Sequence, residues 1–193
     1  MTNRGILIMT SSRISLYHLK GTHYECAHTL GVLTRDAIKH RIADDIGNLS
    51  ELFTFIQTEY GLRLHRDFIA IIRLLYPWYW DEICGLADGS QVPLEQILVL
   101  NFLNETQTAY RLSQDKQINE TGEKGCTTGL LNRQDTNTFS LLHNEDHATA
   151  LYLTGCLIEA DIQSSEYDEG KRRSPDEKFI AYCYAGTIPG MNY

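Results

Sequence analysis

The chain has 193 residues, of which 42% are hydrophobic and 22% charged, an ordinary balance for a globular protein that buries one sizeable core. Its formal net charge is −8, from 17 basic and 25 acidic residues. This balance argues against nucleic acid as a partner, because no basic surplus is available to neutralise phosphates. Its apolar runs are too short and interrupted to span a membrane, and its first residues lack the apolar stretch of a secretory signal. We therefore expect a cytoplasmic protein with no nucleic acid and no membrane partner, while a peroxisomal address at a true C-terminus stays open.

The first part of the chain is predicted to form one strand followed by helices. Residues 14–19 are typical of a strand and end at a turn signal, Gly21. From Tyr24 to about Tyr60, apolar residues recur at three- and four-residue spacing, which indicates helix. Gly47 is predicted to break this run into two helices.

Three further helices are predicted before the polar stretch in the middle of the chain. One covers residues 65–75 and ends before Pro77, because a residue that precedes proline disfavours helical geometry. The next follows that proline, and Gly85 and Gly89 are predicted to mark its exit. The last begins near residue 92, has proline in its first turn and runs to about residue 105.

The second part of the chain is predicted to be rich in strands. Residues 111–124 are polar and lack periodicity, which indicates an exposed loop. After it, short apolar or alternating runs favour a sheet at residues 138–143, 148–160 and 178–185. The charged stretch between the last two is predicted to be a solvated hairpin. Its basic triplet, residues 171–173, is surrounded by acids and is interpreted as part of the hairpin tip rather than as a binding patch.

Five scattered cysteines stand at positions 26, 84, 126, 156 and 183, with no Cys-x-x-Cys pair. In a chain without an export signal, the default expectation is reduced thiols, most of them buried as small apolar residues. Cys126 stands apart, because it lies between Gly125 and Thr127-Thr128-Gly129, where the polar loop meets the first strand-rich segment.

The setting of Cys126 fits the chemistry of an N-terminal nucleophile. If the Gly125–Cys126 bond is cut, the cysteine gains a free α-amine, whose intrinsic pKa of about 7.7–8.0 lets it act as a base near neutral pH. One residue then supplies both nucleophile and base, and the preceding glycine lets the backbone bend toward the thiol. On these residues alone the alternative stays open that the string is only a turn beside a strand, since single cysteines are usually structural.

A second cluster of chemically capable residues follows at positions 143–147, His-Asn-Glu-Asp-His. One hairpin from Thr127 to Asn144 would return this cluster beside Cys126. An acid there could orient a terminal amine, and an amide could donate to an oxyanion. His143 and His147 have metal-ligand spacing only on a helix, and this segment is predicted to be strand or turn, so we predict no metal.

The order of these motifs resembles a known family. Gly-Cys-Thr-Thr with an Asn-x-Asp return is similar to the acyl-coenzyme A:6-aminopenicillanate acyltransferase (isopenicillin-N acyltransferase) family of N-terminal-nucleophile hydrolases, which includes insect β-alanyl amine hydrolases. Four other segments also resemble this family, so that the likeness covers nearly the whole chain: residues 21–25, 80–89, 94–101 and 182–190.

The resemblance implies a fold, a domain organisation and a precursor. The fold is an α/β (α+β) four-layer αββα sandwich, in which two sheets lie between helices. Residues 1–125 would be a mainly helical pro-segment, and residues 126–193 the start of the β-rich nucleophile domain. Family members continue well beyond Gly190, so we expect a chain truncated at its C-terminus and an incomplete sandwich. The two cleaved halves would remain associated, and a homodimer stays open.

The resemblance also assigns roles to individual residues. Cys126 would be the nucleophile and Asp146 the acid that holds its α-amine, with Asn144 as a third catalytic residue. His143 stands where related bile-salt and penicillin hydrolases have an arginine, and it is a candidate substrate contact together with Thr128. The implied function is self-cleavage before Cys126, then hydrolysis or acyl transfer on a small-molecule N-acyl amine through a thioester, without cofactor or metal. The alternative is a non-catalytic truncated form that acts through association with a partner.

Overall fold

The computed structural model describes residues 14–114, 127–144 and 154–189. Strand β1 (Ser15–Thr22) passes directly into helix α1 (His23–Ala43). The strand end expected at Gly21 is wrong, because Gly21 lies inside β1 and pairs with Ile162. Thr22 and Glu25 form a capping box: the Thr22 hydroxyl accepts from the Glu25 N–H at 3.3 Å, and the Thr22 N–H donates to the Glu25 carboxylate at 2.8 Å. This reciprocal pair satisfies two amide groups that the first turn of a helix would otherwise leave open.

Five more helices follow α1: α2 (Leu49–Phe55), α3 (Glu59–Leu75), α4 (Pro77–Ser90), α5 (Leu94–Asn101) and α6 (Leu103–Ser113). The break expected at Gly47 is confirmed, and its φ of 92° is a left-handed value that glycine adopts without strain. The predicted end of a helix before Pro77 is confirmed as well. The third helix begins earlier than predicted, at Glu59, because Thr58 caps it by accepting from the Gly61 N–H at 3.1 Å.

Two of the expected helix boundaries are wrong. Gly85 and Gly89 were expected to mark the exit of α4, yet both lie inside it, and the helix continues to Ser90. The helix expected to run to about residue 105 instead ends at Asn101, and α6 continues to Ser113 into the stretch expected to be a loop. Gly85 and Gly89 do not end α4; they allow it to pack closely against α1.

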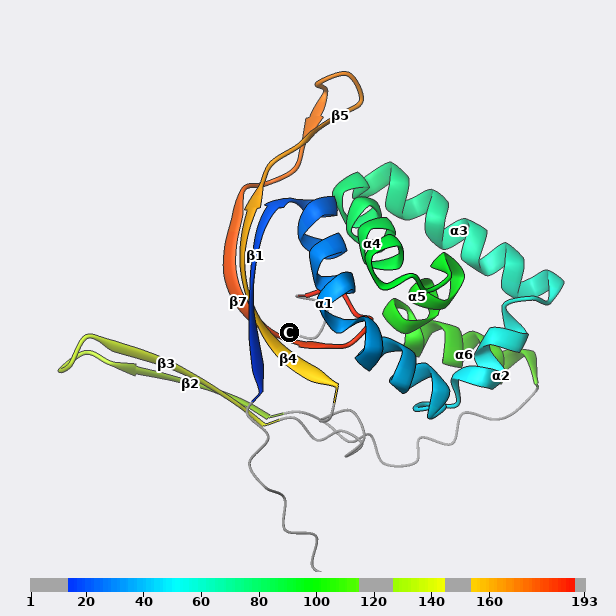
Figure 1. The fold of residues 1–193 in the computed structure, drawn as a ribbon, viewed down its shortest axis with the longest axis horizontal. Helices are drawn as coiled ribbons and strands as arrows, with labels where there is room; N and C mark the ends of the chain where they lie inside the picture. Colours follow the sequence, from blue (N-terminus) through cyan, green and yellow to red (C-terminus); the bar gives the residue numbers. More distant parts are fainter. Residues whose placement is uncertain (1–13, 115–126, 145–153, 190–193) are drawn as a thin grey trace, which may run out of the picture.

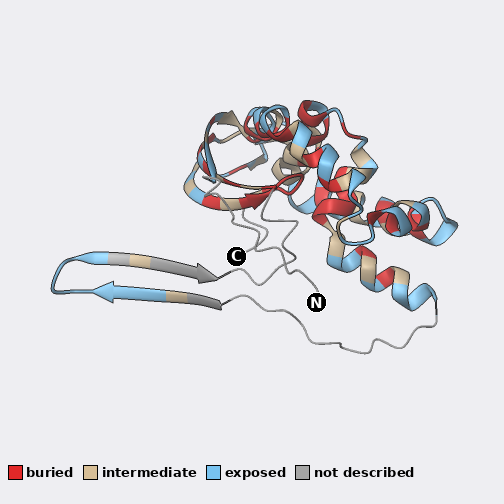
Figure 2. Ribbon diagram, turned by 60° about the horizontal axis from the view of Figure 1, so that its bottom comes forward, coloured by how far each residue is buried: buried red, intermediate tan, exposed pale blue. Residues whose placement is uncertain are grey.

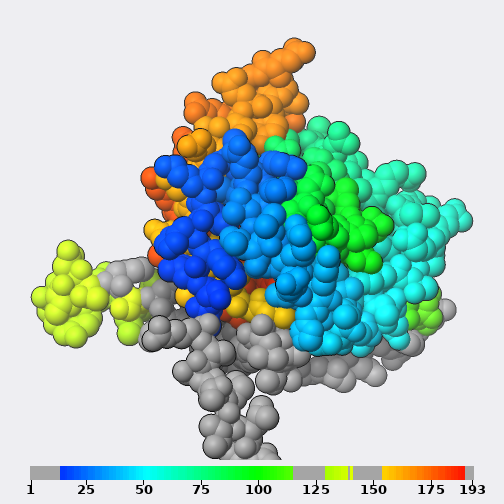
Figure 3. Space-filling model, viewed as in Figure 1, coloured from blue at the N-terminus to red at the C-terminus, as the bar shows by residue number. Residues whose placement is uncertain are grey.

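Glycines allow α1 and α4 to pack closely. A Cβ atom built on Gly31 of α1 would lie 2.6 Å from the Leu86 carbonyl oxygen of α4. Added Cβ atoms on Gly85 and Gly89 would likewise collide with the backbone of α1, at Tyr24 and His28 respectively. The space-filling view shows the surfaces of α1 and α4 side by side (Figure 3). Backbone-to-backbone approach of this kind is open only to residues without a side chain.

Three strands form the main sheet, in the order β1-β4-β7 (Figure 1). Strand β4 (Gly155–Gln163) pairs in parallel with β1 and antiparallel with β7 (Glu177–Tyr184). Between β4 and β7, the short strands β5 (Glu166–Tyr167) and β6 (Arg172–Arg173) form a hairpin that extends beyond the sheet. The basic triplet lies at this hairpin, with Lys171 exposed in the turn, as expected from the sequence.

The sheet has one buried face and one exposed face. Cys156, Ile158, Ala160 and Ile162 alternate along β4 toward the helices and are all buried. The helices of the described chain lie on this face, where most of the buried residues gather (Figures 1 and 2). On the opposite face, a carboxylate oxygen of Glu159 lies 2.7 Å from His18 Nδ1. The apolar side chains of Leu16 and Ile180 on the same face are 48% and 71% exposed.

The architecture is therefore a mixed α/β fold in which helices cover one face of a small sheet, compatible with the expected α+β class. Within residues 14–114, 127–144 and 154–189, no helix combines the length and the apolar character needed to cross a membrane.

Candidate active site around the nucleophile hairpin

A separate hairpin joins the two sequence clusters that carry the predicted chemistry. Strands β2 (Thr127–Arg133) and β3 (Thr138–Asn144) pair antiparallel, with Thr127 opposite Asn144 and Thr128 opposite His143. The predicted hairpin from residue 127 to residue 144 is thus confirmed, including its register. Its tip holds Asn137 in a left-handed conformation (φ 48°), which asparagine tolerates better than most residues.

The register pairs the first residue of β2 with the last residue of β3, and the expected nucleophile and acid lie close to these two strand ends in the sequence. Cys126 is bonded to Thr127, the first residue of β2, and Asp146 follows the last residue of β3 by two positions. Gly125, Cys126 and Asp146 themselves lie outside the described residues. Thr128, His143 and Asn144 are described here through their backbone pairing alone.

The hairpin projects away from the main sheet (Figures 1 and 3). Two adjacent leucines of β2 are exposed to a degree unusual for apolar side chains, Leu130 by 63% and Leu131 by 53%. Consecutive residues of a strand point to opposite sides, so both faces of this hairpin present apolar surface. Surface of that kind in a two-stranded hairpin is stable only when a further layer covers it.

The four other cysteines are poorly suited to act as nucleophiles. Burial raises the pKa of the Cys26 thiol and of the Cys84 thiol to about 11, so both are protonated near neutral pH. Cys156 and Cys183 face each other across β4 and β7 with exposures of 3% and 1%. Their mutual hydrogen bond raises the pKa of Cys183 and lowers that of Cys156, but both thiols lie within the core. All four are unbridged.

A buried ion pair, not foreseen from the sequence, lies where α1 and α4 begin. His23 Nδ1 is 2.5 Å from a carboxylate oxygen of Glu82, and the two side chains are only 1% and 12% exposed. Burial acts most strongly on the His23 ring and lowers its pKa, but the hydrogen bond and charge of Glu82 outweigh it, and the net pKa is raised. Burial is also the main cause of a raised pKa for the Glu82 carboxyl.

Two further buried polar residues hold the turn that follows β7. Asn101 of α5 donates to the carbonyls of Ile97 and Gly186 at 2.8 and 3.0 Å, and its side-chain oxygen accepts from the Ile188 N–H at 2.8 Å. Arg41 of α1, 3% exposed, donates to the Ala185 carbonyl at 2.8 Å. Burial lowers the pKa of Arg41 to about 10. The hydrogen bonds to residues 185–188 connect positions more than eighty residues apart, so no local pattern reveals them.

Among the residues that the structure describes, no group of three or more His, Cys, Asp or Glu side chains could hold a metal ion. His143 lies on strand β3, so the i, i+4 helical spacing with His147 does not apply to it.

No protein-family model matches the chain. It is similar to a β-alanyl-dopamine/carcinine hydrolase from Drosophila melanogaster, with 25% identity over 186 residues. The similarity covers 96% of this chain and 46% of that protein, so the chain spans about half the length of the curated relative. It includes the helices, the hairpin and the main sheet together, and it supports the relationship to a hydrolase that the motif order suggests.

Proposed function

We propose that the chain is part of a self-cleaving cysteine amidohydrolase or acyltransferase of the N-terminal-nucleophile type, acting on N-acyl amines such as β-alanyl amines. The observation that carries this proposal is the register of the β2–β3 hairpin, which pairs the neighbour of Cys126 with Asn144, two residues before Asp146. The similarity to a hydrolase of β-alanyl-dopamine and carcinine supports the substrate class.

Self-cleavage would proceed through an acyl shift. The Cys126 thiol attacks the Gly125 carbonyl carbon, its proton passes to the departing amide nitrogen, and the acyl group moves from nitrogen to sulfur. Water then hydrolyses this thioester, which leaves the Gly125 carboxylate and a free α-amine on Cys126. That amine, with its intrinsic pKa of about 7.7–8.0, becomes the base for the mature reaction.

Turnover would use the same two atoms of Cys126. The α-amine takes the thiol proton, the thiolate attacks the amide carbonyl of an N-acyl amine, and the amine leaves with that proton. Water, or a second amine, releases the acyl group from the thioester. Asp146 holds the protonated α-amine, the Asn144 amide donates to the oxyanion, and His143 and Thr128 contact the substrate.

The arrangement of the main sheet supports the proposal that the cleaved halves stay associated. Strand β1 precedes the proposed cut, whereas β4 and β7 follow it, and all three share one sheet. Arg41 and Asn101 also precede it, and they bind backbone groups of residues 185–188. Scission before residue 126 would therefore break one peptide bond without removing any of these contacts.

The exposed face of the sheet supports the four-layer sandwich as the complete fold. An αββα sandwich has one helical layer on the outer face of each sheet, and the inner faces of the two sheets pack together. Here the helices cover one face of β1-β4-β7, and the other face exposes Leu16 and Ile180. The exposed side chains of Leu130 and Leu131 on the β2–β3 hairpin are also apolar surface that further layers of the sandwich would cover.

Mass spectrometry of the purified chain tests the proposal directly. We expect two fragments that meet between residues 125 and 126, a single intact mass in Cys126→Ala, and unchanged cleavage in the matched control Cys84→Ala. In a form of the protein that spans the length of its Drosophila relative, β-alanine release from carcinine should be lost in Cys126→Ala and retained in Cys84→Ala. An intact wild-type mass, together with full activity in Cys126→Ala, would refute the mechanism.

A second candidate function is non-catalytic association with a partner. The observation that favours it is the same exposed sheet face with Leu16 and Ile180. Light scattering of the chain in solution distinguishes this function from amide hydrolysis. An oligomer that dissociates in Ile180→Asp would favour association through this face. A monomer that binds no partner would count against it.

A further inference from the structure

A cavity of about 610 Å³ opens between the start of α4 and the first residues of β7. Its walls include His23 and Glu82, which form the buried ion pair, Trp78 and Tyr79 from the first turn of α4, and Glu177 and Phe179 from β7. The volume lies within the range typical of small-molecule sites, about 300–1,000 Å³. Every one of these residues is at least partly buried.

Two buried polar atoms in these walls have no hydrogen-bond partner among the residues that the structure describes. They are Nε2 of His23, whose ring is 1% exposed, and the phenol oxygen of Tyr79. The Pro175 backbone makes the smallest contribution to the raised pKa of His23, and Nε2 forms no hydrogen bond within the described residues. Since Nδ1 faces the Glu82 carboxylate, Nε2 is the nitrogen left for a ligand. Buried polar groups are rarely left unsatisfied, so this pair points to a polar occupant.

The charge of the cavity is negative on balance. His23 and Glu82 compensate each other, whereas the Glu177 carboxylate forms no ion pair within the described chain, although its charge also helps to raise the pKa of His23. The adjacent Lys178 also lines the cavity, but its ammonium group pairs with Asp161 at 3.3 Å, on the other side of the strand from Glu177. Asp176, at the rim, adds a further carboxylate that accepts from the Ser164 N–H at 2.8 Å.

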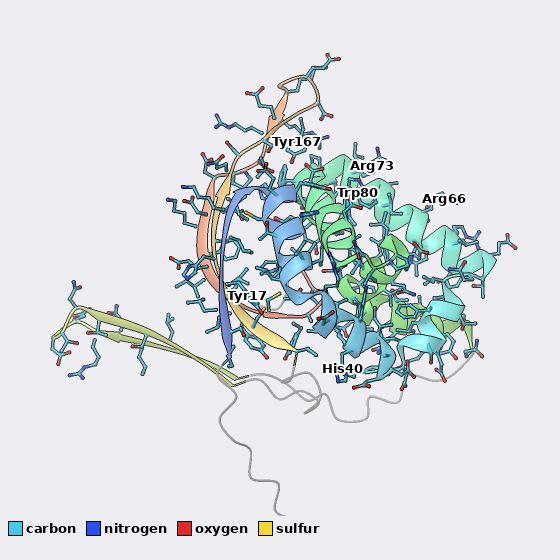
Figure 4. The ribbon with its side chains drawn as sticks, in the orientation of Figure 1. Tyr17, His40, Arg66, Arg73, Trp80 and Tyr167 are labelled. Carbon is cyan, nitrogen blue, oxygen red and sulfur yellow. The ribbon has the colours of Figure 1, made fainter. Side chains whose placement is uncertain are left out.

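Aromatic side chains in the cavity walls, together with its carboxylates, are suited to bind an organic ammonium group. Trp78, Tyr79 and Phe179 present ring surface, and the Trp78 ring is fixed by Tyr167 at a centroid distance of 6.2 Å. Tyr167 in turn donates to Asp81 at 2.6 Å, which places it at the base of the β5–β6 hairpin beside α4 (Figure 4). Rings beside a carboxylate bind organic ammonium groups through cation–π and ionic attraction together.

We propose that this cavity is a binding site for a small aromatic primary ammonium ion that also carries a hydroxyl or carbonyl oxygen. Glu177 binds the ammonium group, Trp78 and Phe179 contact its ring, and His23 Nε2 and the Tyr79 hydroxyl bind the oxygen. The site uses no residue of the β2–β3 hairpin and does not depend on Cys126. It therefore stands or falls separately from the proposed amide chemistry.

Calorimetric titration with tyramine tests the site, because this probe has the ring, the ammonium group and the hydroxyl. We expect 4-ethylphenol, which lacks the ammonium group, and phenethylamine, which lacks the hydroxyl, each to bind about tenfold more weakly. Glu177→Gln should weaken tyramine about tenfold and leave 4-ethylphenol unchanged. Glu169→Gln, in the exposed turn of the β5–β6 hairpin, is the matched control and should bind tyramine like the wild type.

The aromatic wall has its own control on the same helix. Trp78→Leu should weaken tyramine about three- to tenfold, whereas Trp80→Leu should not, since Trp80 lies outside the cavity wall and packs under the Arg73 guanidinium at 5.8 Å (Figure 4). The proposal is overturned if tyramine fails to bind at millimolar concentration, if 4-ethylphenol binds equally well, or if Glu177→Gln retains wild-type affinity. Cys126→Ala should bind tyramine normally.

Discussion

Asn101 joins the helical part of the chain to the turn after β7 with two hydrogen bonds, to Gly186 and Ile188, and its side chain also donates to the Ile97 carbonyl of its own helix. Asn101→Leu fills the space but leaves the Gly186 carbonyl and the Ile188 N–H buried without partners. Each such group costs about 1–3 kcal/mol, so we expect the free energy of unfolding to fall by about 2–4 kcal/mol in a urea titration. Asn104→Ala, on the exposed surface of α6, should stay within about 0.5 kcal/mol of the wild type.

The His23–Glu82 pair predicts a dependence of stability on pH. The pKa of His23 is raised above 6.5 in the folded protein, so its stabilising contribution is complete below pH 6.5 and is lost as pH rises through the folded value. The raised pKa of Glu82 acts in the same direction, because ionising this buried carboxyl on folding is unfavourable.

The wild type should therefore lose its advantage over His23→Gln as pH rises from 6 to 8.5, measured as the difference in unfolding free energy. His40→Gln is the control, because His40 pairs with Asp44 on the exposed surface. A difference between wild type and His23→Gln that grows with pH would contradict the assignment.

At the scale of elements, the contact between α1 and α4 depends on the absence of side chains. An added methyl group on Gly31 would lie 2.6 Å from the Leu86 carbonyl and 2.8 Å from the Ser90 amide nitrogen, both on a helix backbone that has no freedom to yield locally. We expect Gly31→Ala to destabilise the fold by about 1–3 kcal/mol, as overpacked cores do. Asp36→Ala, on the exposed face of the same helix, should be neutral or slightly stabilising. Thermal unfolding of both variants measures the contrast.

Local sequence patterns predicted most of the helices and strands. They gave wrong boundaries where a contact between distant parts of the chain determines the structure. Pro77 ends α3 and Gly47 breaks the first helical run because each residue limits or frees its own backbone. The glycines of α4 were interpreted as helix ends for the same local reason, yet their purpose is the approach of α1 some sixty residues earlier in the chain. The capping box of Thr22 and Glu25 is a further local feature, because its two residues are only three positions apart.

In the candidate site, too, local features could be predicted from the sequence and long-range contacts could not. The β2–β3 hairpin was predictable, because one short polar turn, residues 134–137, separates its two strands and fixes which residues pair. The roles assigned to Cys126 and Asp146 stay predictions, since these residues lie outside the described chain. The His23–Glu82 pair was not predictable, because its members are 59 positions apart and come together only when α1 packs on α4.

At the scale of the whole molecule, the main sheet provides a test of which face belongs to the core. Ile158 on β4 is 0% exposed and belongs to the buried face, whereas Ile180 on β7 pairs with Glu159 on the opposite face and is 71% exposed. Ile158→Ala removes methyl groups from a filled interior and should cost about 2–5 kcal/mol of unfolding free energy. Ile180→Ala should cost less than about 0.5 kcal/mol in this chain.

The same pair of variants in a longer protein would reveal whether a second sheet covers the exposed face. If the four-layer sandwich is formed there, Ile180 becomes a core residue, and Ile180→Ala should then cost about as much as Ile158→Ala, because both remove the same atoms from a buried layer. A cost for Ile180→Ala that stays below about 0.5 kcal/mol in both proteins would exclude a sheet packed against this face, while the loss at Ile158 reports that the helical side is intact.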